Sequence, residues 1–180
     1  MTTHGDNLHI LAIDLGGGGP KVALVSQQGE IVARARRTIR THFLPGGGVE
    51  QDPEEWWQTI TSAAQEVIST APIDPEDIAA VSCTGQWSVT VPVDENGQHL
   101  MRAVHWMDSR GAPYTHAMTD GLIKFEGYGL RRLFTWLRLT GGAPTHSGAD
   151  VLAHILFIKN EHPEVYARTS PMTYINDAAT

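Results

Sequence analysis

The sequence has a single cysteine, so no disulfide can form within the chain and an apolar core has to hold the fold. This cysteine, Cys83, lies between Ser82 and Thr84 in an apolar stretch. That setting predicts a buried small side chain rather than a nucleophile. A chain without disulfides is typical of a reducing compartment, and we therefore expect a cytoplasmic protein.

No stretch of the sequence approaches the roughly 18 consecutive apolar residues of a membrane-spanning helix. The first residues, MTTHGDNLH, lack the basic and apolar segments of a secretory signal peptide. The chain has 13 basic and 20 acidic residues and a net charge of −7, whereas proteins that bind nucleic acid or anionic membranes do so through cationic patches. The composition favours a small-molecule ligand, with no nucleic-acid and no membrane partner.

The most informative stretch is LHILAIDLGGGGPKVALV, residues 8–25. Its first half is a continuous apolar run, typical of a central strand with no solvent-exposed face, and Asp14 is expected where that strand ends. Residues 16–19 are glycines, which tolerate positive φ angles and allow backbone N–H groups to converge on an anion. The stretch therefore predicts a phosphate site.

The residues after the glycines exclude two common phosphate loops. A P-loop or a dinucleotide-binding loop needs a helix directly after its glycines. Here Pro20 and Lys21 lead into VALVS, which is a strand pattern. We predict the tip of a hairpin, with Asp14 ending one strand and Lys21 opening its antiparallel partner. The alternative is a flexible glycine hairpin with a solvated Lys21.

This arrangement resembles the first phosphate motif of the superfamily of sugar kinases, hexokinase, Hsp70 and actin, whose common form is D-x-G-T-S/T-x-x-K/R. Asp14, Gly16 and Lys21 match that form, whereas Gly17 and Gly18 replace its two hydroxyl residues. The resemblance implies that Asp14 holds Mg²⁺ through water. It also implies that the glycine amides and Lys21 bind the phosphates of ATP without help from hydroxyl groups.

A third strand and a helix are predicted after the hairpin. The strand alternates imperfectly, and we interpret Arg34 and Arg36 on its polar side as a charged sheet edge, with a phosphate clamp as the alternative. Asp52 followed by Pro53 and two glutamates is typical of a helix start. An apolar stripe then continues almost to Pro72, which predicts a helix that covers the sheet.

Two longer gapped patterns resemble the FGGY family of carbohydrate kinases, and its xylulokinase-like members most closely. The first pattern, G-G-x-E-Q-D-P-x-x-W-W, runs from Gly47 to Trp57. The second ends in W-x-D-x-R and retains Gly85, Gln86, Val91, Asp94, Gly97, Leu100, Ala103, Trp106, Asp108 and Arg110. The resemblance implies a ribonuclease H-like α/β fold, with a mixed sheet and flanking helices. It also implies ATP-dependent phosphorylation of a sugar or polyol.

Polar and aromatic residues follow the predicted strand at residues 78–84, where α/β sheets often bind ligands. Sugar hydroxyls donate and accept hydrogen bonds, so the amide of Gln86 and the carboxylate of Asp108 suit them. An indole such as Trp87 or Trp106 suits the C–H patches of a sugar.

The family's Met-His pair is replaced here by Trp87 and Ser88, which leaves the identity of the sugar open. The predicted substrate-binding residues are Gln86, Trp87, Ser88, Trp106 and Asp108. For Asp108 the alternative is a helix N-cap paired with Arg110, and for Trp106 it is core packing.

The resemblance runs from about Leu8 to the end of the chain, but a family member is more than twice as long. It implies that residues 1–180 are the N-terminal part of an incomplete first, sugar-binding domain, and that the second, nucleotide-binding domain is absent. The general-base aspartate is expected beyond Thr180, so no catalytic residue is assigned here. We expect this stretch alone to be inactive.

Two other classes of function remain open. A non-catalytic sugar-binding or regulatory module is favoured by the glycines at 17 and 18. An Hsp70- or actin-like protein would use the same hairpin without a sugar, and both FGGY patterns argue against it. Assembly into a homodimer is left open. Two further helices are predicted at about residues 130–139 and 149–160.

Overall fold

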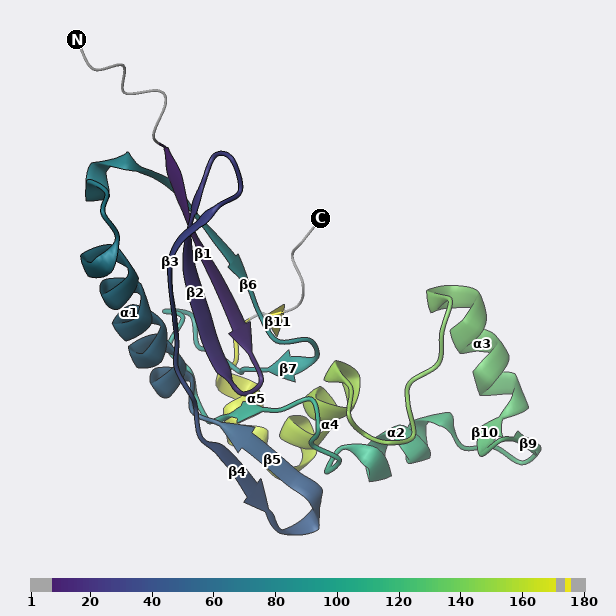
Figure 1. Cartoon of the computed structure of the whole chain (residues 1–180). Helices are drawn as coiled ribbons and strands as arrows, with labels where there is room; N and C mark the ends of the chain where they lie inside the picture. Colours follow the sequence, from purple (N-terminus) through teal and green to yellow (C-terminus); the bar gives the residue numbers. More distant parts are fainter. Residues whose placement is uncertain (1–7, 171–173, 176–180) are drawn as a thin grey trace. The chain divides into compact units, whose positions relative to one another are not determined.

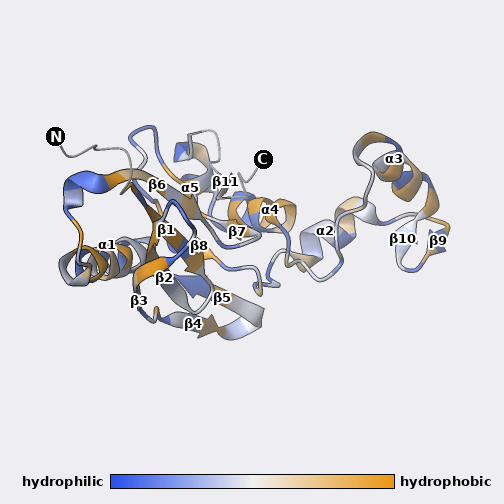
Figure 2. Cartoon of the chain, turned by 45° about the horizontal axis from the view of Figure 1, so that its top comes forward, coloured by the Kyte–Doolittle hydropathy of each residue, from blue (hydrophilic) through white to orange (hydrophobic). Residues whose placement is uncertain are grey.

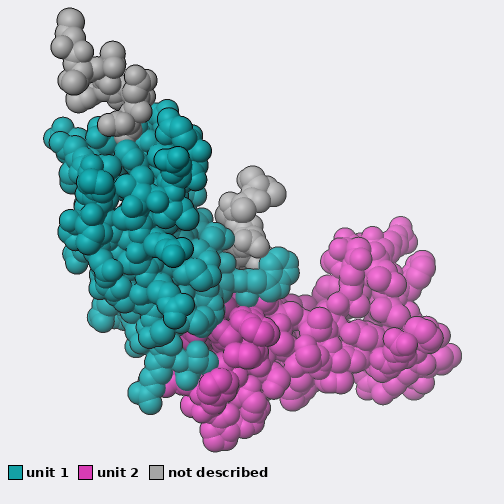
Figure 3. Space-filling model, in the orientation of Figure 1, with its two compact units in different colours: residues 1–41, 52–87, 176–180 teal, residues 42–51, 88–175 magenta. Residues whose placement is uncertain are grey.

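The computed structural model describes residues 8–170 and 174–175 of the chain (Figure 1). It shows a mixed α/β protein with two compact units, each described by itself below (Figure 3). Unit 1 comprises residues 1–41, 52–87 and 176–180, and unit 2 comprises residues 42–51 and 88–175.

Unit 1 contains a four-stranded sheet and one long helix. In chain order its elements are β1 (His9–Gly16), β2 (Gly19–Ser26), β3 (Ile31–Arg36), α1 (Pro53–Thr70), the 3₁₀ helix η2 (Pro75–Asp77) and β6 (Ile78–Thr84). The strand order is β3-β2-β1-β6, with β1 antiparallel to β2 and parallel to β6, and with β2 antiparallel to β3. The predicted mixed sheet and its central first strand are confirmed.

Helix α1 covers one face of this sheet (Figure 1). The core between them contains Leu11, Val22, Leu24, Ala63 and Val67, all buried, and Figure 2 shows apolar residues concentrated on β1 and β2. Because side chains alternate along a strand, the neighbours of these residues face away from α1. Ile10 is 42% exposed on that open face, so the prediction that β1 has no solvent-exposed face is wrong for this chain.

The sequence signals at the start of α1 act as predicted. The Asp52 side chain accepts a hydrogen bond from the Glu54 N–H at 2.9 Å, Pro53 occupies the first turn, and the helix ends at Thr70. The negative charge of Asp52 also interacts favourably with the positive end of the helix dipole. The cap and Pro53 therefore determine where the helix begins, and the buried apolar residues of α1 pack it against the sheet.

Strand β6 pairs with β1, but it is not the buried strand that its apolar sequence suggests. Its residues from Ala79 to Thr84 are all exposed, and Val81 is 61% exposed. Cys83 is exposed as well, so the prediction of a buried cysteine is wrong. Only its first residue, Ile78, packs against the core of unit 1.

Unit 2 is built around small sheet segments and three longer helices. Its elements are β4 (Thr41–Leu44), whose first residue belongs to unit 1, η1 (Pro45–Gly47), β5 (Gly48–Gln51), β7 (Val89–Thr90), β8 (Ala103–Val104), α2 (Ala112–Thr119), β9 (Lys124–Phe125), β10 (Tyr128–Gly129), α3 (Leu130–Thr140), α4 (Val151–Glu161), α5 (Pro163–Arg168) and β11 (Tyr174–Ile175). Its larger sheet has the order β11-β7-β8-β5-β4. The helices predicted near residues 130–139 and 149–160 are confirmed as α3 and α4.

Candidate functional site

The glycine stretch forms the tight hairpin that the sequence predicts. Gly16 of β1 pairs with Gly19 of β2, and the chain leaves the turn as a strand, not as a helix. Asp14 and Lys21 are cross-strand partners, and the Lys21 Nζ donates to the Asp14 Oδ2 at 2.9 Å. Lys21 and Asp14 are 70% and 45% exposed, so solvent and ligands can reach both charges.

Only one of the four glycines uses a conformation that favours glycine. Gly19 has φ +127°, and a Cβ there would lie 2.2 Å from the carbonyl oxygen of Arg37. Gly17 and Gly18 are not among the glycines with positive φ, and a Cβ at Gly18 would meet no atom within 4 Å. The tolerance of glycine for positive φ is therefore used at Gly19, and a side chain is sterically acceptable at Gly18.

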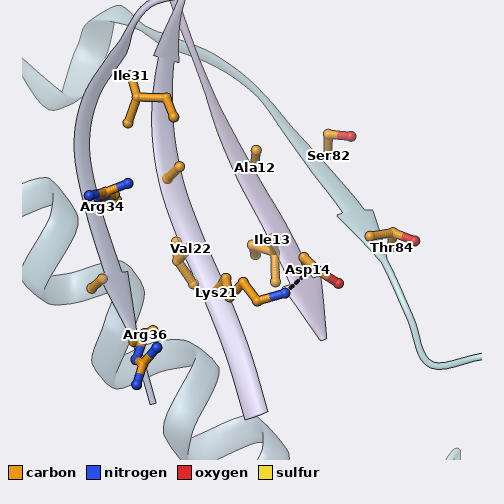
Figure 4. A pocket seen from close by; sticks show the side chains of 12 residues that line it. Ala12, Ile13, Asp14, Lys21, Val22, Ile31, Arg34, Arg36, Ser82 and Thr84 are labelled. Atoms are coloured by element: carbon orange, nitrogen blue, oxygen red, sulfur yellow. Dashed lines mark hydrogen bonds and ion pairs between the residues drawn. The ribbon is translucent and has the colours of Figure 1, made fainter. Parts of the chain in front are cut away.

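The open face of the unit 1 sheet forms a cavity of about 690 Å³ (Figure 4). Its polar lining comprises Asp14, Lys21, Arg34, Arg36, Ser82 and Thr84. The sheet register places four of these side chains in one row across the strands, in the order Thr84, Asp14, Lys21 and Arg36. Asp14 and Lys21 thus face a cavity beside the hairpin.

The single carboxylate of Asp14 fits a magnesium ion that is already coordinated by phosphate oxygens and water. Mg²⁺ prefers oxygen ligands and retains several waters, and proteins commonly hold it through one or two carboxylates together with substrate phosphates. Asp14 supplies a carboxylate whose Oδ1 accepts no hydrogen bond from the described residues. The part of the chain that the structure describes contains no group of three His, Cys, Asp or Glu residues that could cage a metal. A metal–phosphate complex is therefore a better match than a free ion.

The predicted sugar residues at the end of β6 differ in exposure. In unit 1, Gln86 is buried, and Trp87 is 69% exposed. In unit 2, Ser88 is buried and has φ +54°, which is unusual for a residue other than glycine. The strained backbone at Ser88 marks the point where the chain passes from β6 to β7.

Trp106 and Asp108 lie on a loop of unit 2 between β8 and α2. Trp106 is 46% exposed, so core packing does not account for it. Asp108 has no exposed side-chain surface. Its oxygens accept from the Val49 N–H at 2.8 Å and from the Arg110 Nη2 at 2.7 Å. Asp108 is therefore engaged by the protein's own groups.

Arg110 connects this aspartate to strand β5. Its Nη2 also donates to the Glu50 Oε1 at 2.8 Å, and its guanidinium lies 4.2 Å from the ring centroid of Phe157. Burial alone would lower the pKa of Arg110, but the hydrogen bonds that it donates to Asp108 and Glu50 raise this pKa above its ordinary value. The charged side chain of Arg110 therefore connects Asp108, on the Trp106 loop, with Glu50 on β5.

Two buried histidines lie close to this cluster. The His154 Nδ1 lies 3.1 Å from the Thr90 hydroxyl, and the His105 Nδ1 accepts from the Met107 N–H at 3.3 Å. Burial lowers the pKa of both imidazoles, although the negative charge of Asp108 partly offsets this effect. Both rings are therefore neutral near pH 7.

Comparison with known sequences identifies the family. The N-terminal domain of the FGGY family of carbohydrate kinases matches residues 9–178. The chain belongs to this FGGY family. The alternative of an Hsp70- or actin-like protein is correspondingly disfavoured.

Individual relatives agree with this assignment. The FGGY chain is 35% identical over 150 residues to a glycerol kinase of Xanthobacter autotrophicus, covering 82% of this chain and 28% of the relative. It is 30% identical over 162 residues to a xylulose kinase of Bacillus subtilis, covering 90% of this chain and 30% of the relative. The chain thus spans less than a third of the length of these relatives.

Solved structures confirm the fold. A xylulose kinase from Lactobacillus acidophilus matches with a TM-score of 0.76 at 17% identity, covering 93% of the FGGY chain and 31% of that protein. A Plasmodium falciparum glycerol kinase matches with a TM-score of 0.76 at 20% identity, covering 94% and 33%. The predicted sugar-kinase type of α/β fold is therefore correct.

The structure brings together some of the predicted site residues of the FGGY chain and adds others. Within unit 1 it joins Asp14 and Lys21 beside the glycine turn. Within unit 2 it pairs Asp108 with Arg110, as the alternative interpretation of Asp108 proposed, although Asp108 does not cap α2, whose N-cap is Gly111. The structure also adds Glu50, which in the sequence stands out only as part of the E-Q-D-P pattern. Glu50 is buried and accepts a hydrogen bond from the Arg110 Nη2.

Proposed function

We propose that this chain is the phosphate-binding and sugar-binding part of an ATP-dependent kinase that phosphorylates a sugar or polyol. The observation that supports it most directly is the exposed Asp14–Lys21 pair beside a glycine turn on the open face of the sheet. Phosphoryl transfer depends mainly on positioning and on neutralising charge, and a carboxylate for the metal and an ammonium for the phosphate supply both.

In this proposal Asp14 would hold Mg²⁺ through water, and the bound metal would neutralise charge on the transferred phosphoryl group. Lys21 and the N–H groups of Gly16, Gly17 and Gly18 orient the phosphates. Lys21 also holds the Asp14 carboxylate in place through the 2.9 Å hydrogen bond. Losing either partner should therefore weaken binding of the metal–nucleotide complex.

The sugar-binding part of the proposal uses Gln86, Trp87, Ser88, Trp106 and Asp108. Trp106 and Trp87 offer exposed indole faces, which suit the C–H patches of a sugar. Asp108 is buried and saturated by Arg110 and Val49, so we assign it the role of holding the loop that carries Trp106. Xylulose, glycerol and related polyols are the substrate candidates, because relatives that act on the first two are known by name.

The catalytic base is proposed to be an aspartate outside these 180 residues, as the family resemblance implies. The 180 residues are then the N-terminal part of the sugar-binding domain, and they should bind ligands without turning them over. A cytoplasmic setting fits the use of ATP, and a homodimer remains a prediction. The described residues contain no helix that is long and apolar enough to cross a membrane.

A second candidate is a sugar-binding module of the same family that has lost catalysis. The glycines at positions 17 and 18 favour it, because they remove the two hydroxyl groups that the family motif provides. This candidate predicts sugar binding without any binding of Mg²⁺ and ATP.

Calorimetric titration separates the two candidates. The kinase proposal predicts that the protein binds Mg²⁺ with a non-hydrolysable ATP analogue, and that Asp14→Asn and Lys21→Met each weaken this binding about tenfold, the loss of one charge-assisted contact. Arg138→Gln removes a charge from an exposed position of α3 and is the control. Sugar binding without nucleotide binding would support the second candidate and would contradict the first.

A further inference from the structure

We infer that Arg36, on the edge strand β3, is a further phosphate-binding residue that substitutes for the hydroxyl groups missing from the glycine turn. The inference rests on the proposed nucleotide site and adds a residue from a strand outside the family's hairpin motif. The sequence alone favoured a different role for Arg36, as a solvated charge that protects the sheet edge.

The register of the sheet places Arg36 beside the predicted phosphate site. Arg36 is the cross-strand partner of Lys21, and Lys21 is the cross-strand partner of Asp14. Directly opposite residues on neighbouring strands project to the same face, with Cβ atoms roughly 5 Å apart. Asp14, Lys21 and Arg36 all line the 690 Å³ cavity on the open face (Figure 4).

The charges in this row leave Arg36 available to a ligand. Lys21 is already paired with Asp14, so this pair contributes no net charge. Among the described residues, none forms an ion pair or a hydrogen bond with the side chain of Arg36 or that of Arg34. By contrast, Arg37 projects from the other face and is held by Ser62 and Glu66. The cavity therefore carries a positive charge that the protein does not neutralise, in a chain of net charge −7.

A guanidinium is well suited to the ligand that the turn is predicted to bind. Its planar N–H donors can hold two phosphate oxygens at once, and they remain charged at any physiological pH. The turn itself supplies only backbone amides, because Gly17 and Gly18 carry no hydroxyl. Arg36 would restore side-chain donors to the phosphate from the neighbouring strand.

Arg34 is an internal comparison for Arg36, because it lies farther from the turn. It lies on the same face of β3 but one row farther from the hairpin, opposite Ala23 and not opposite Lys21. Two residues along a strand correspond to about 6.8 Å. A contact to a phosphate at the turn should therefore depend on Arg36 more than on Arg34.

The test is a calorimetric titration of the protein with Mg²⁺ and a non-hydrolysable ATP analogue, with tripolyphosphate and with xylulose 5-phosphate. We expect Arg36→Gln to weaken binding of the analogue and of tripolyphosphate about tenfold, Arg34→Gln to weaken it less, and Arg138→Gln, at an exposed position of α3, to leave it unchanged. Arg36→Lys should retain part of the affinity. Unfolding curves of each variant check that the sheet is intact.

A second variant tests the compensation directly. A Cβ at Gly18 would meet no atom within 4 Å, and the backbone there has no positive φ, so Gly18→Ser should fold normally. In the Arg36→Gln background it should recover several-fold of the lost affinity, because it returns a hydroxyl to the turn.

The outcomes distinguish this inference from the proposed function. If the protein binds the ATP analogue and loses affinity with Asp14→Asn but not with Arg36→Gln, the role of Arg36 is wrong and the kinase proposal stands. If xylulose 5-phosphate alone depends on Arg36, the arginine binds product phosphate and its assignment to the nucleotide is overturned. If no phosphate ligand binds at all, both proposals fail.

Discussion

The carboxylate of Asp108 and the guanidinium of Arg110 are joined by hydrogen bonds from two nitrogens, Nε at 3.0 Å and Nη2 at 2.7 Å to the same oxygen. The Asp108 side chain is completely buried, and the Arg110 side chain is 16% exposed. A buried charge is tolerated when it is paired and fully hydrogen-bonded. This pair, with Glu50 as a second acceptor, holds the W-x-D-x-R loop in its observed conformation.

Replacing Arg110 should therefore destabilise unit 2 strongly. Arg110→Met leaves the carboxylates of Asp108 and Glu50 buried without their cation, and removing one partner of a buried pair costs about 3–5 kcal/mol. Urea unfolding measures this change. Arg138→Met, at an exposed position of α3, is the control and should change the free energy of unfolding by less than about 0.5 kcal/mol. An equal effect of both substitutions would contradict a structural role for the pair.

The glycine turn should respond very differently to substitutions at neighbouring positions. Gly19→Ala places a Cβ against the Arg37 carbonyl at a positive φ, and we expect a loss of roughly 1–3 kcal/mol in the free energy of unfolding. Gly18→Ala meets no atom and should be neutral or slightly stabilising, because it reduces the freedom of the unfolded chain. Thermal unfolding of the two variants decides the matter. An equal loss of stability in Gly18→Ala would contradict this difference between the two positions.

The buried histidines predict a loss of stability in mild acid. Burial lowers the pKa of His154 and of His105, so the unfolded chain takes up protons at a higher pH than the folded protein. Stability is then complete above the unfolded pKa of about 6.5 and decreases as the pH falls below it. His154→Gln should reduce this dependence in unfolding curves recorded between pH 8 and pH 5. His99→Gln, at an exposed position, should leave the dependence unchanged, and a flat wild-type profile would contradict the prediction.

The exposed indole of Trp106 should matter for sugar binding more than for stability. Trp106→Ala removes an aromatic face that is 46% exposed, and we expect roughly a tenfold loss of affinity for the preferred sugar. Trp57→Ala removes an indole that is 64% exposed on α1 and is the matched control. Titration with xylulose and with glycerol measures both variants. Equal affinities in wild type and Trp106→Ala would remove Trp106 from the sugar site.

The sequence by itself determined the local elements and the family. The hairpin followed from an apolar run, a glycine turn and a second strand pattern, because a helix would have required a different periodicity after the glycines. Helix α1 followed from its Asp52 cap and its apolar stripe. Asp14 and Lys21 could be predicted as neighbours because a tight turn sets the register of the two strands that it joins.

Only the tertiary structure decided which side chains are buried and which strands are neighbours. Cys83 looks like a core residue in the sequence, yet it is exposed because β6 packs against the core only through Ile78, at its other end. Asp108 looks like a ligand-binding carboxylate, yet it is buried because Arg110 and the distant Val49 satisfy it. The position of Arg36 beside Lys21 likewise depends on how β3 pairs with β2. Burial and pairing across long sequence separations are properties of the packed fold, which local patterns do not encode.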